Sequence, residues 1–203
     1  MGKLITELSV SLDGFVAGPN DGPNQPLGAG GEALFAWYQS GETPLALPGT
    51  DMVFRVSQNS ADFLRPLWAA YGAMITGRRM FDIARAWGGH PPVEGPCFVV
   101  THTPAPEWQE PGSPFVFVTD GVASAVRQAQ AVAGEKNISV ASASVMQQCL
   151  ALGLLDEVQI DLVPVLLGGG VCLFGPGRAP VALERTHTVA APDVTHLRYR
   201  VVK

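Results

Sequence analysis

Short apolar runs alternate with segments of helical periodicity along most of this chain, and that alternation limits the folds open to it. Runs typical of buried strands occupy residues 4–12, 73–76, 98–101, 115–118, 138–140 and 158–167. Between them, segments with apolar residues three and four positions apart predict helices at residues 60–71, 77–86, 120–133 and 144–152. Strands that alternate with helices predict an α/β fold, with a mainly parallel sheet and helices on both faces.

The carboxyl-terminal part of the sequence departs from that alternation. Two strand-like runs, Val181–Val189 and Thr195–Val202, are joined by Pro192-Asp193 and predict a hairpin. We therefore expect antiparallel strands at one edge of the sheet. A length of 203 residues suits a single domain over residues 1–203.

A segment rich in proline and glycine, residues 18–60, interrupts the pattern near the amino terminus. The whole chain has 23 glycines and 17 prolines, and many of them fall in this segment. Residues 32–39 within it have a helical pattern whose Leu34, Phe35, Trp37 and Tyr38 need burial. So long an irregular stretch inside a compact domain is usually a functional loop or lid, and we call residues 18–60 the insert.

The charge balance and the rare residues exclude several classes of protein. Lys and Arg number 13 against 18 Asp and Glu, and the resulting net charge of −5 is unsuited to sequence-independent nucleic-acid binding. No apolar run reaches the roughly 18 residues of a membrane span, and no signal-peptide pattern opens the chain. Three separated cysteines and four scattered histidines predict neither a disulfide framework nor a metal site. We expect a cytoplasmic protein that binds a small molecule.

Three motifs at the ends of predicted strands are candidates for ligand contacts. Gly77, Arg78 and Arg79 open a helix after a strand, where backbone N–H groups and guanidinium groups favour phosphate; a solvated surface pair is the alternative. Asp13 follows the first strand at the edge that faces the ligand crevice of an open α/β sheet, although Asp-Gly is also a plain turn signal. The small residues at 141–144 either leave room for a ligand or simply pack a strand against a helix.

Taken in order, these motifs resemble those of a known family. The motifs are Ser11-Leu12-Asp13-Gly14-Phe15-Val16-Ala17-Gly18, Gly77-Arg78-Arg79-Met80-Phe81-Asp82, Phe98-Val99-Val100-Thr101-His102, Gly153-Leu154-Leu155-Asp156-Glu157-Val158 and Pro164-Val165-Leu166-Leu167-Gly168. They are similar to those of the dihydrofolate-reductase-like proteins related to the reductase domain of bacterial riboflavin biosynthesis, over about residues 4–202. The resemblance implies a three-layer α/β/α fold with a mixed sheet, and often a homodimer.

The resemblance also implies NADPH as cofactor, bound across the carboxyl ends of the strands in those members that act as reductases. The residues that would contact NADPH are Gly77, Arg78 and Arg79 at its phosphates, Thr101 and His102 at its adenosine end, and Ala141, Ser142 and Ala143 at its pyrophosphate. Asp13 would be the catalytic residue, orienting the substrate or relaying a proton. The residues that would border the substrate are Phe35, Trp37 and Phe54 of the insert and Asp161.

Three departures from the family pattern fall on the expected cofactor contacts. Ala141-Ser142 stands where the family has a glycine pair, Met80 where it often has threonine, and Thr103 where it often has arginine. Each change could weaken dinucleotide binding by about 1–3 kcal/mol. Three hypotheses therefore stand: an NAD(P)H-dependent reductase of a small heterocyclic or conjugated substrate, a repurposed isomerase or cyclase of an apolar metabolite without nicotinamide, and a non-catalytic ligand-binding protein.

Overall fold

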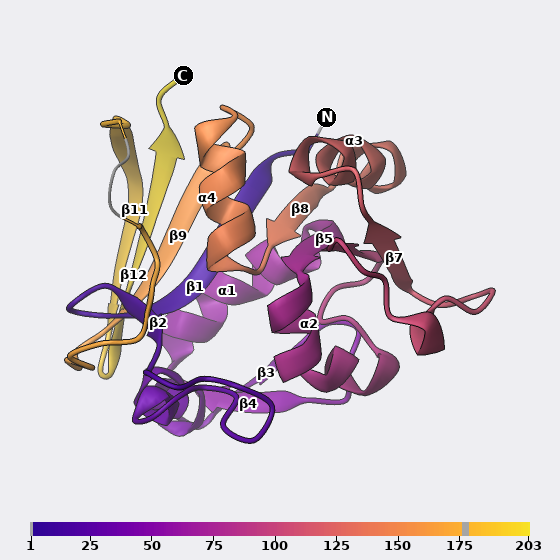
Figure 1. The fold of residues 1–203 in the computed structure, drawn as a ribbon. Helices are drawn as coiled ribbons and strands as arrows, with labels where there is room; N and C mark the ends of the chain where they lie inside the picture. Colours follow the sequence, from indigo (N-terminus) through magenta and orange to yellow (C-terminus); the bar gives the residue numbers. More distant parts are fainter. Residues whose placement is uncertain (1, 176–178) are drawn as a thin grey trace.

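The computed structural model describes residues 2–175 and 179–203, and one large sheet runs through it (Figure 1). The strands of this sheet are β1 (Leu4–Ser11), β5 (Tyr71–Gly77), β6 (Cys97–Val100), β7 (Phe115–Val118), β8 (Asn137–Val140), β9 (Glu157–Val163), β11 (Leu183–Ala191) and β12 (Val194–Val201). Within the described part of the chain the sheet has eight strands in the order β11-β12-β9-β1-β8-β5-β6-β7.

The pairing within the sheet confirms the predicted mixed architecture. The six strands from β9 to β7 are parallel to their neighbours, and β1 lies between β8 and β9 with Ile5 opposite both Ser139 and Glu157. The β11–β12 hairpin joins this parallel block antiparallel, through β12 against β9. The carboxyl ends of the parallel strands therefore meet at one edge of the sheet.

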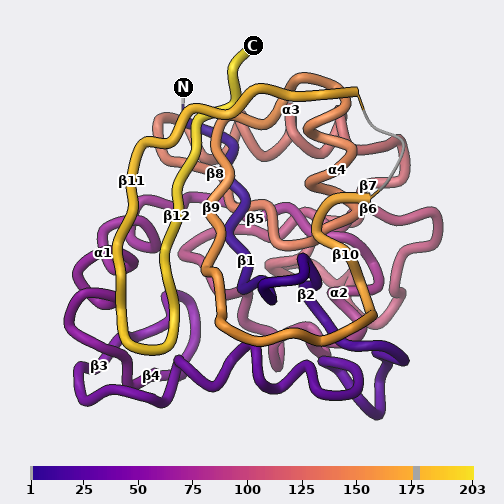
Figure 2. Tube along the Cα trace, turned by 90° about the vertical axis from the view of Figure 1, so that its left-hand side faces the viewer, coloured from indigo at the N-terminus to yellow at the C-terminus, as the bar shows by residue number. Residues whose placement is uncertain are grey.

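Helices cover both faces of the sheet, as the alternation predicts. The helices are α1 (Gln58–Ala69), α2 (Arg78–Ile83), α3 (Val122–Ala133) and α4 (Ala143–Ala151), with the 3₁₀ segments η1 (Gly31–Gln39), η2 (Arg85–Gly89) and η3 (Pro106–Trp108). Figure 2 shows α1 on one side of β9, β1 and β8, and α4 on the other. The fold is thus three-layered, α/β/α.

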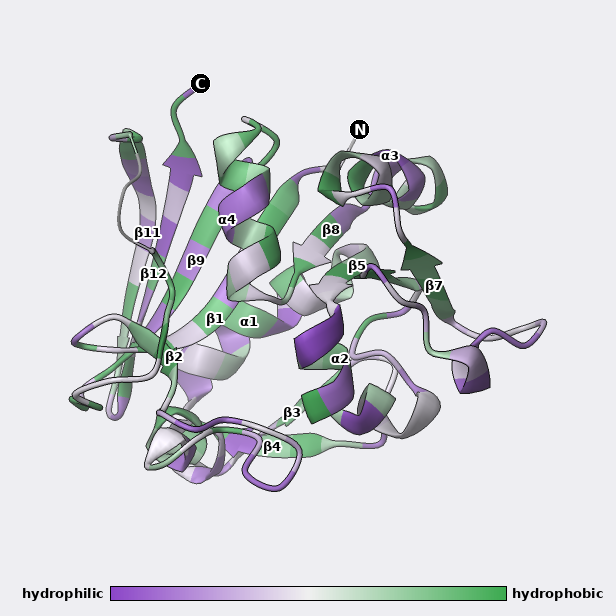
Figure 3. Ribbon diagram, viewed as in Figure 1, coloured by the Kyte–Doolittle hydropathy of each residue, from purple (hydrophilic) through white to green (hydrophobic). Residues whose placement is uncertain are grey.

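Each face of the sheet has its own apolar core, because successive side chains of a strand point to opposite faces. On the face of α3 and α4, Leu4 of β1 joins the buried cluster with Val126 and Met146. On the face of α1, Ile5 of the same strand joins Leu64 and other buried residues. Figure 3 shows β7 hydrophobic along its length, whereas β9 alternates between hydrophilic and hydrophobic residues. The hydrophilic residues of β9 matter for the site described below.

The insert is more regular than its composition predicts. It contains a second hairpin, β3 (Thr43–Ala46) paired with β4 (Val53–Val56), whose Leu45 and Val56 are buried in the core on the α1 face. A separate two-stranded sheet pairs β2 (Phe15–Ala17) with β10 (Val171–Cys172). The insert therefore completes the layer on that face of the sheet.

Two predicted boundaries are wrong. The ninth strand ends at Val163 instead of continuing to residue 167, because Pro164 follows and has no N–H for a ladder. The helix expected over residues 77–86 ends at Ile83, and Arg85, Ala86 and Trp87 then adopt left-handed φ angles of 50°, 51° and 48°. Non-glycine residues rarely adopt this conformation, and it redirects the chain at Trp87.

Candidate active site

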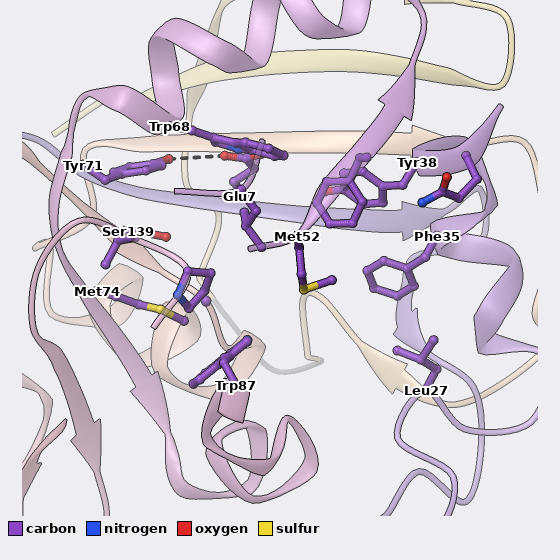
Figure 4. A pocket seen from close by; sticks show the side chains of 16 residues that line it. Glu7, Leu27, Phe35, Tyr38, Met52, Trp68, Tyr71, Met74, Trp87 and Ser139 are labelled. Carbon is purple, nitrogen blue, oxygen red and sulfur yellow. Dashed lines mark hydrogen bonds between the residues drawn. The ribbon is translucent and has the colours of Figure 1, made fainter. Parts of the chain in front are cut away.

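A cavity of about 440 Å³ lies on the α1 face of the sheet, enclosed by β1, β5, β8, α1 and the insert (Figure 4). Its walls are mostly aromatic or aliphatic. The lining residues are Glu7, Leu27, Phe35, Tyr38, Gln39, Leu47, Met52, Phe54, Trp68, Tyr71, Met74, Trp87, Pro92, Val93, Ser139 and Ala141. Its volume falls in the ordinary range of small-molecule sites, and we call it the aromatic pocket.

The insert supplies one wall of the aromatic pocket as a run of contacting rings. Phe35 and Tyr38 of η1 are stacked with their ring centroids 6.2 Å apart. Tyr38 lies 4.4 Å from Phe54 of β4, and Phe54 lies 6.2 Å from Trp68 of α1. Phe35 and Phe54 thus line the pocket, where the sequence interpretation expects substrate contacts.

Trp87 reaches the pocket from the opposite side, as Figure 4 shows, through the left-handed stretch of η2. Three successive non-glycine residues with positive φ cost on the order of 1 kcal/mol each. Such strain is usual at binding and catalytic sites, where the surrounding packing maintains it.

Glu7 provides the single carboxyl among the described residues that line the aromatic pocket. Its Oε1 accepts a hydrogen bond of 2.8 Å from Trp68 Nε1, and its Oε2 accepts one of 3.4 Å from the Tyr71 hydroxyl. The pKa of Glu7 is raised to about 8, chiefly by burial and then by the negative charge of Asp161, while the Trp68 hydrogen bond, the charge of Arg198 and the Tyr71 hydrogen bond lower it. At neutral pH Glu7 is therefore mostly protonated and can donate a proton into the pocket.

The sequence analysis missed Glu7, although a signal was present. Glu7 is the one ionisable residue in the strand Leu4–Ser11, and its odd position places it on the same face as Ile5. Burying a carboxyl in an interior strand of a parallel sheet reduces stability unless the carboxyl has a hydrogen-bond partner. Its presence in this strand therefore indicated a functional or partnered residue.

Asp161 does not line the aromatic pocket, which corrects its expected role in substrate binding. It is fully buried in β9, with Oδ1 2.7 Å from His196 Nδ1 and 3.2 Å from Gln159 Nε2. His196 Nε2 lies 2.9 Å from Ser60 Oγ at the start of α1. Ser60, His196 and Asp161 are arranged like a hydrolytic triad, but all three are buried and none borders either ligand cavity described here. They connect α1, β12 and β9, and Asp161 acts on the site through its charge.

Trp37 is also outside the pocket, contrary to the expectation for the insert. Only 2% of its surface is exposed, its Nε1 donates to Ser9 Oγ at 3.1 Å, and its ring stacks beneath Tyr38 at 3.8 Å. Trp37 supports the aromatic wall from behind. Periodicity alone could not tell a residue that lines the pocket from one that supports its wall, because the aromatic residues of η1 lie close together within nine residues.

Asp13 lies at an exposed loop outside both ligand cavities, and its contacts are with its own chain. Its Oδ1 accepts from Ser11 Oγ and from the Leu167 N–H, and its Oδ2 accepts from the Gly168 N–H at 2.7 Å. The Ser11 hydrogen bond, together with those from Gly168 and Leu167, lowers the pKa of Asp13. In this geometry Asp13 holds the loop after β9 against the loop after β1, and its catalytic role stays a prediction.

A second cavity of about 440 Å³ opens at the carboxyl ends of β5, β6 and β7, and it gathers most of the expected cofactor residues. Its lining residues are Gly77, Arg78, Arg79, Val100, Thr101, His102, Thr103, Thr119, Gly121, Ser144, Val145 and Gln148. Among these described residues none is acidic and two are arginines, so the cavity suits an anionic ligand. We call it the anion groove.

Both arginines of the anion groove already have partners. Arg78 Nε donates to the Asp82 carboxylate at 2.8 Å, and its guanidinium also donates to the Thr103 carbonyl. Arg79 forms an ion pair of 2.6 Å with Asp21 of the insert. Because the side chains of Arg78 and Arg79 are 34% and 64% exposed, a phosphate can compete for the guanidinium groups at small cost.

Residues 141–142 lie between the two cavities. Ala141 lines the aromatic pocket, and a Cβ built on Gly77 in the anion groove would lie 3.2 Å from Ser142 Oγ. Ser142 and Ala143 do not line either cavity, although the Ser142 hydroxyl lies 3.2 Å from that of Ser144, which does. The groove is therefore retained, and the Ser142 side chain lies beside it, close to Gly77. NADPH thus fits the chemistry of both cavities.

Among residues 2–175 and 179–203, no three His, Cys, Asp or Glu side chains are grouped closely enough to hold a metal ion. Over those residues, too, no helix combines the length and the apolar character that crossing a membrane requires.

This sheet order, with ligand cavities on both sides of the carboxyl ends of β5 and β8, defines an α/β/α protein of the dihydrofolate-reductase type. The model of the RibD C-terminal domain matches residues 2–197, and the chain belongs to that family. A curated relative, the uncharacterized protein YyaP of Bacillus subtilis (strain 168), is 24% identical over 197 residues, which cover 92% of this chain and 87% of that protein.

Solved structures share the fold over the full length of the chain. A putative riboflavin biosynthesis protein from Shewanella sp. PV-4 has a TM-score of 0.71 at 20% identity, covering 100% of both chains. Dihydrofolate reductase from Enterococcus faecalis, complexed with NADP(H) and RAB-propyl, has a TM-score of 0.56 at 12% identity, covering 100% of this chain and 98% of that one. The fold class and the family expected from the sequence are thereby confirmed.

Proposed function

We propose that this protein is an NAD(P)H-dependent reductase of a small conjugated or heterocyclic substrate. One observation carries the proposal: the aromatic pocket, with the raised-pKa carboxyl of Glu7, lies next to a groove with the chemistry of a phosphate site. Membership of the RibD C-terminal domain family supports it, as does the likeness of the fold to a reductase complexed with NADP(H).

In this proposal the anion groove holds the phosphates and the adenosine end of the cofactor. Arg78 and Arg79 exchange their carboxylate partners for phosphate oxygens, and Thr101 and His102 flank the adenosine. Reduced nicotinamide, when bound, supplies a hydride. The segment 141–142 separates the two cavities and controls how closely a ligand in one approaches a ligand in the other.

Glu7 supplies the proton that complements hydride addition. The substrate's C=C or C=N bond gains hydride at carbon, and the Glu7 O–H transfers its proton to the other atom of that bond, leaving a carboxylate. Trp68 Nε1 and the Tyr71 hydroxyl hold that carboxylate in place through their hydrogen bonds, and water entering the open pocket returns the proton.

The test measures cofactor binding and turnover separately. Tryptophan fluorescence, to which Trp68 and Trp87 contribute from the pocket, should be quenched saturably by NADPH or NADH. Arg79→Ala should weaken that binding about tenfold, whereas Arg55→Ala, an exposed arginine of β4 outside both cavities, should not. No saturable quenching up to millimolar cofactor would overturn the proposal.

Turnover is tested with NADPH and a panel of conjugated heteroaromatic compounds. Glu7→Gln should reduce kcat/KM by about 10²- to 10⁴-fold, the usual contribution of a general acid. In the wild type kcat/KM should fall as the pH rises above about 8, because Glu7 then loses the proton it must donate. A Glu7→Gln variant with unchanged kcat/KM at every pH would exclude Glu7 as the acid.

A second candidate function is a non-redox isomerase or cyclase that uses the same pocket. The observation in its favour is the closeness of the Ser142 side chain to Gly77, together with the carboxylate partners that occupy both arginines. In that case Glu7 would still exchange protons with an apolar substrate, but no nicotinamide would be consumed. Stoichiometric oxidation of NADPH with any substrate of the panel excludes this candidate.

A further inference from the structure

We infer that the aromatic pocket takes an uncharged, planar, two-ring substrate without phosphate, and that it excludes phosphorylated nucleotides. This inference rests on the proposed function, because it names the substrate class of the same site. It is drawn from two neighbouring cavities: the aromatic pocket, whose one carboxyl is Glu7, and the anion groove, which is lined by Arg78 and Arg79.

The aromatic pocket has no cationic side chain in its described lining. Among the described lining residues the polar groups are the side chains of Glu7, Gln39 and Ser139, two tyrosine hydroxyls (Tyr38 and Tyr71) and two indole N–H groups (Trp68 and Trp87), and none is a Lys, Arg or His. A phosphate needs cationic or clustered N–H donors to replace its hydration. Here it would instead meet aromatic walls and a carboxyl, which is unfavourable in either protonation state of Glu7.

Arg198 is the cation whose charge reaches Glu7, and it is already engaged by other residues on the same face of the sheet. Its Nε and a terminal nitrogen donate to Gln159 Oε1 at 3.0 and 2.7 Å, and its guanidinium lies 4.8 Å above the Phe63 ring. It does not line the pocket, so it offers no phosphate contact there.

The aromatic pocket has a wall of contacting rings that suits a flat ligand. Phe35, Tyr38 and Phe54 form a continuous ring wall, and Trp87 faces it across the cavity (Figure 4). Flat ligands stack favourably on such walls. At the opening, Phe35 is 36% and Met52 is 51% exposed, so a ligand would cover apolar surface that is otherwise in water.

Two polar side chains of the sheet, Glu7 and Ser139, lie at one end of the aromatic pocket. Glu7 and the Ser139 hydroxyl come from neighbouring strands of the sheet and lie at the end of the pocket away from Leu27, as Figure 4 shows. They can pair with one heteroatom edge of a bicyclic ring system. The other ring of such a ligand would meet mostly aromatic and aliphatic side chains.

The two cavities can be told apart experimentally through the methionines. The sequence has five, of which Met52 and Met74 line the aromatic pocket, Met80 follows the arginines of the anion groove, and Met146 is buried in the other core. In protein labelled with ¹³C at the methionine methyl groups, each signal therefore reports on one place. Single Met→Leu variants assign the signals.

The probes are quinoxaline, an uncharged bicyclic heteroaromatic, and uridine 5′-monophosphate, each titrated at pH 6.5 without cofactor. Quinoxaline should shift the signals of Met52 and Met74 saturably and bind at least about tenfold more tightly than the nucleotide at those signals. The nucleotide should leave Met52 and Met74 in place, whether or not it shifts Met80. Equal or tighter effects of the nucleotide on Met52 and Met74 overturn the inference, as does quinoxaline having no effect on them.

A gain-of-function variant tests charge as the cause. Gln39→Arg places a guanidinium at the exposed rim of the aromatic pocket, and uridine 5′-monophosphate should then shift Met52. Gln58→Arg, an exposed position at the start of α1 that lines neither cavity, is the matched control and should not confer the shift. If Gln39→Arg gains no nucleotide binding, charge is not the basis of the exclusion.

These measurements involve no turnover, so they separate the inference from the proposed function. Binding of quinoxaline without any NADPH-dependent reduction would leave the substrate class standing and remove the reductase. If a substrate is reduced but the nucleotide shifts the Met52 and Met74 signals, the reductase function stands and the substrate class is removed.

Discussion

At the scale of single residues, Glu7 acquires its chemistry from neighbours that are far away in the sequence. Trp68 and Tyr71, which donate to its carboxyl, follow it by 61 and 64 positions. Asp161, whose charge helps to raise its pKa, lies on the adjacent strand β9. The strand pattern could place a carboxyl on this face of β1, but only the packed sheet makes it a proton donor at neutral pH.

The raised pKa of Glu7 predicts a pH-dependent effect on stability. The folded protein holds the Glu7 proton up to about pH 8 and the unfolded chain only to about 4.5, so the stability contributed by the neutral carboxyl is complete below pH 4.5 and lost as the pH rises through 8. Glu7→Gln should therefore increase the free energy of unfolding at pH 9 by about 1–3 kcal/mol relative to the wild type, since water in the open pocket reduces the full effect.

Urea unfolding of both proteins at pH 4 and pH 9 measures this difference. The two curves should agree at pH 4 apart from the local cost of the substitution, and diverge at pH 9. A stability gap that does not change between the two pH values contradicts the raised pKa of Glu7.

At the scale of elements, Asp13 joins the loop after β1 to the loop after β9. Asp13→Ala removes acceptors for the N–H groups of Leu167 and Gly168, which should then exchange with solvent deuterium much faster than in the wild type. Its lowered pKa means that this contribution is present above pH 3.8 and lost as the pH falls through the folded pKa. Hydrogen exchange at pH 7 measures the effect, and Asp193→Ala in the exposed β11–β12 turn should leave both amides protected.

The turn of the β3–β4 hairpin is held against the loop that contributes Pro92 and Val93 to the aromatic pocket. Gly49 has φ +76°, and a Cβ there would lie 2.3 Å from the Pro91 carbonyl oxygen and 2.6 Å from that of Val93. Gly49→Ala should therefore reduce the free energy of unfolding by about 2–4 kcal/mol.

A matched control separates overlap from backbone strain. Gly112 also has a positive φ, +90°, but no atom lies within 4 Å of the position of its added Cβ. Gly112→Ala should cost only about 1 kcal/mol in the same denaturation experiment. Equal losses for the two variants would mean that the hairpin is not anchored at Gly49.

At the scale of the whole molecule, the buried network of Ser60, His196 and Asp161 connects a helix, the sheet and the terminal hairpin. His196→Leu leaves the Asp161 carboxylate without its closest partner and should destabilise the protein by about 3–5 kcal/mol. In the described part of the chain Asp161 Oδ2 already has no hydrogen-bond partner. Adding Asp161→Asn to His196→Leu should restore part of the loss in urea unfolding, because it removes the unpaired charge, whereas the exposed His187→Ala should have little effect.

The homodimer implied by the family resemblance stays a prediction, and it too concerns the whole molecule. Light scattering on the purified protein measures it directly, and a mass of one chain, 21.4 kDa, would contradict it.

The sequence predicted the layers of this protein better than its site. The strand and helix runs, the carboxyl-terminal hairpin and the turn of Gly77, Arg78 and Arg79 follow from local pattern. The grouping of Thr101 and His102 with that turn follows from the family resemblance. Trp37 and Asp161 were expected at the substrate but are buried, because a residue behind a pocket wall or in a buried network has the same one-dimensional pattern as one that lines a pocket. Glu7 was missed because its importance depends on what packs around it.

The sequence by itself determined the α/β alternation, the parallel sheet with its antiparallel edge, and the anion-suited turn after β5, since each depends on periodicity or on neighbouring residues. The tertiary structure alone decided which aromatic residues form the pocket and which support it, and why one carboxyl is neutral. The pKa of Glu7 depends on desolvation and on charges brought close by folding, and no window of consecutive residues contains them.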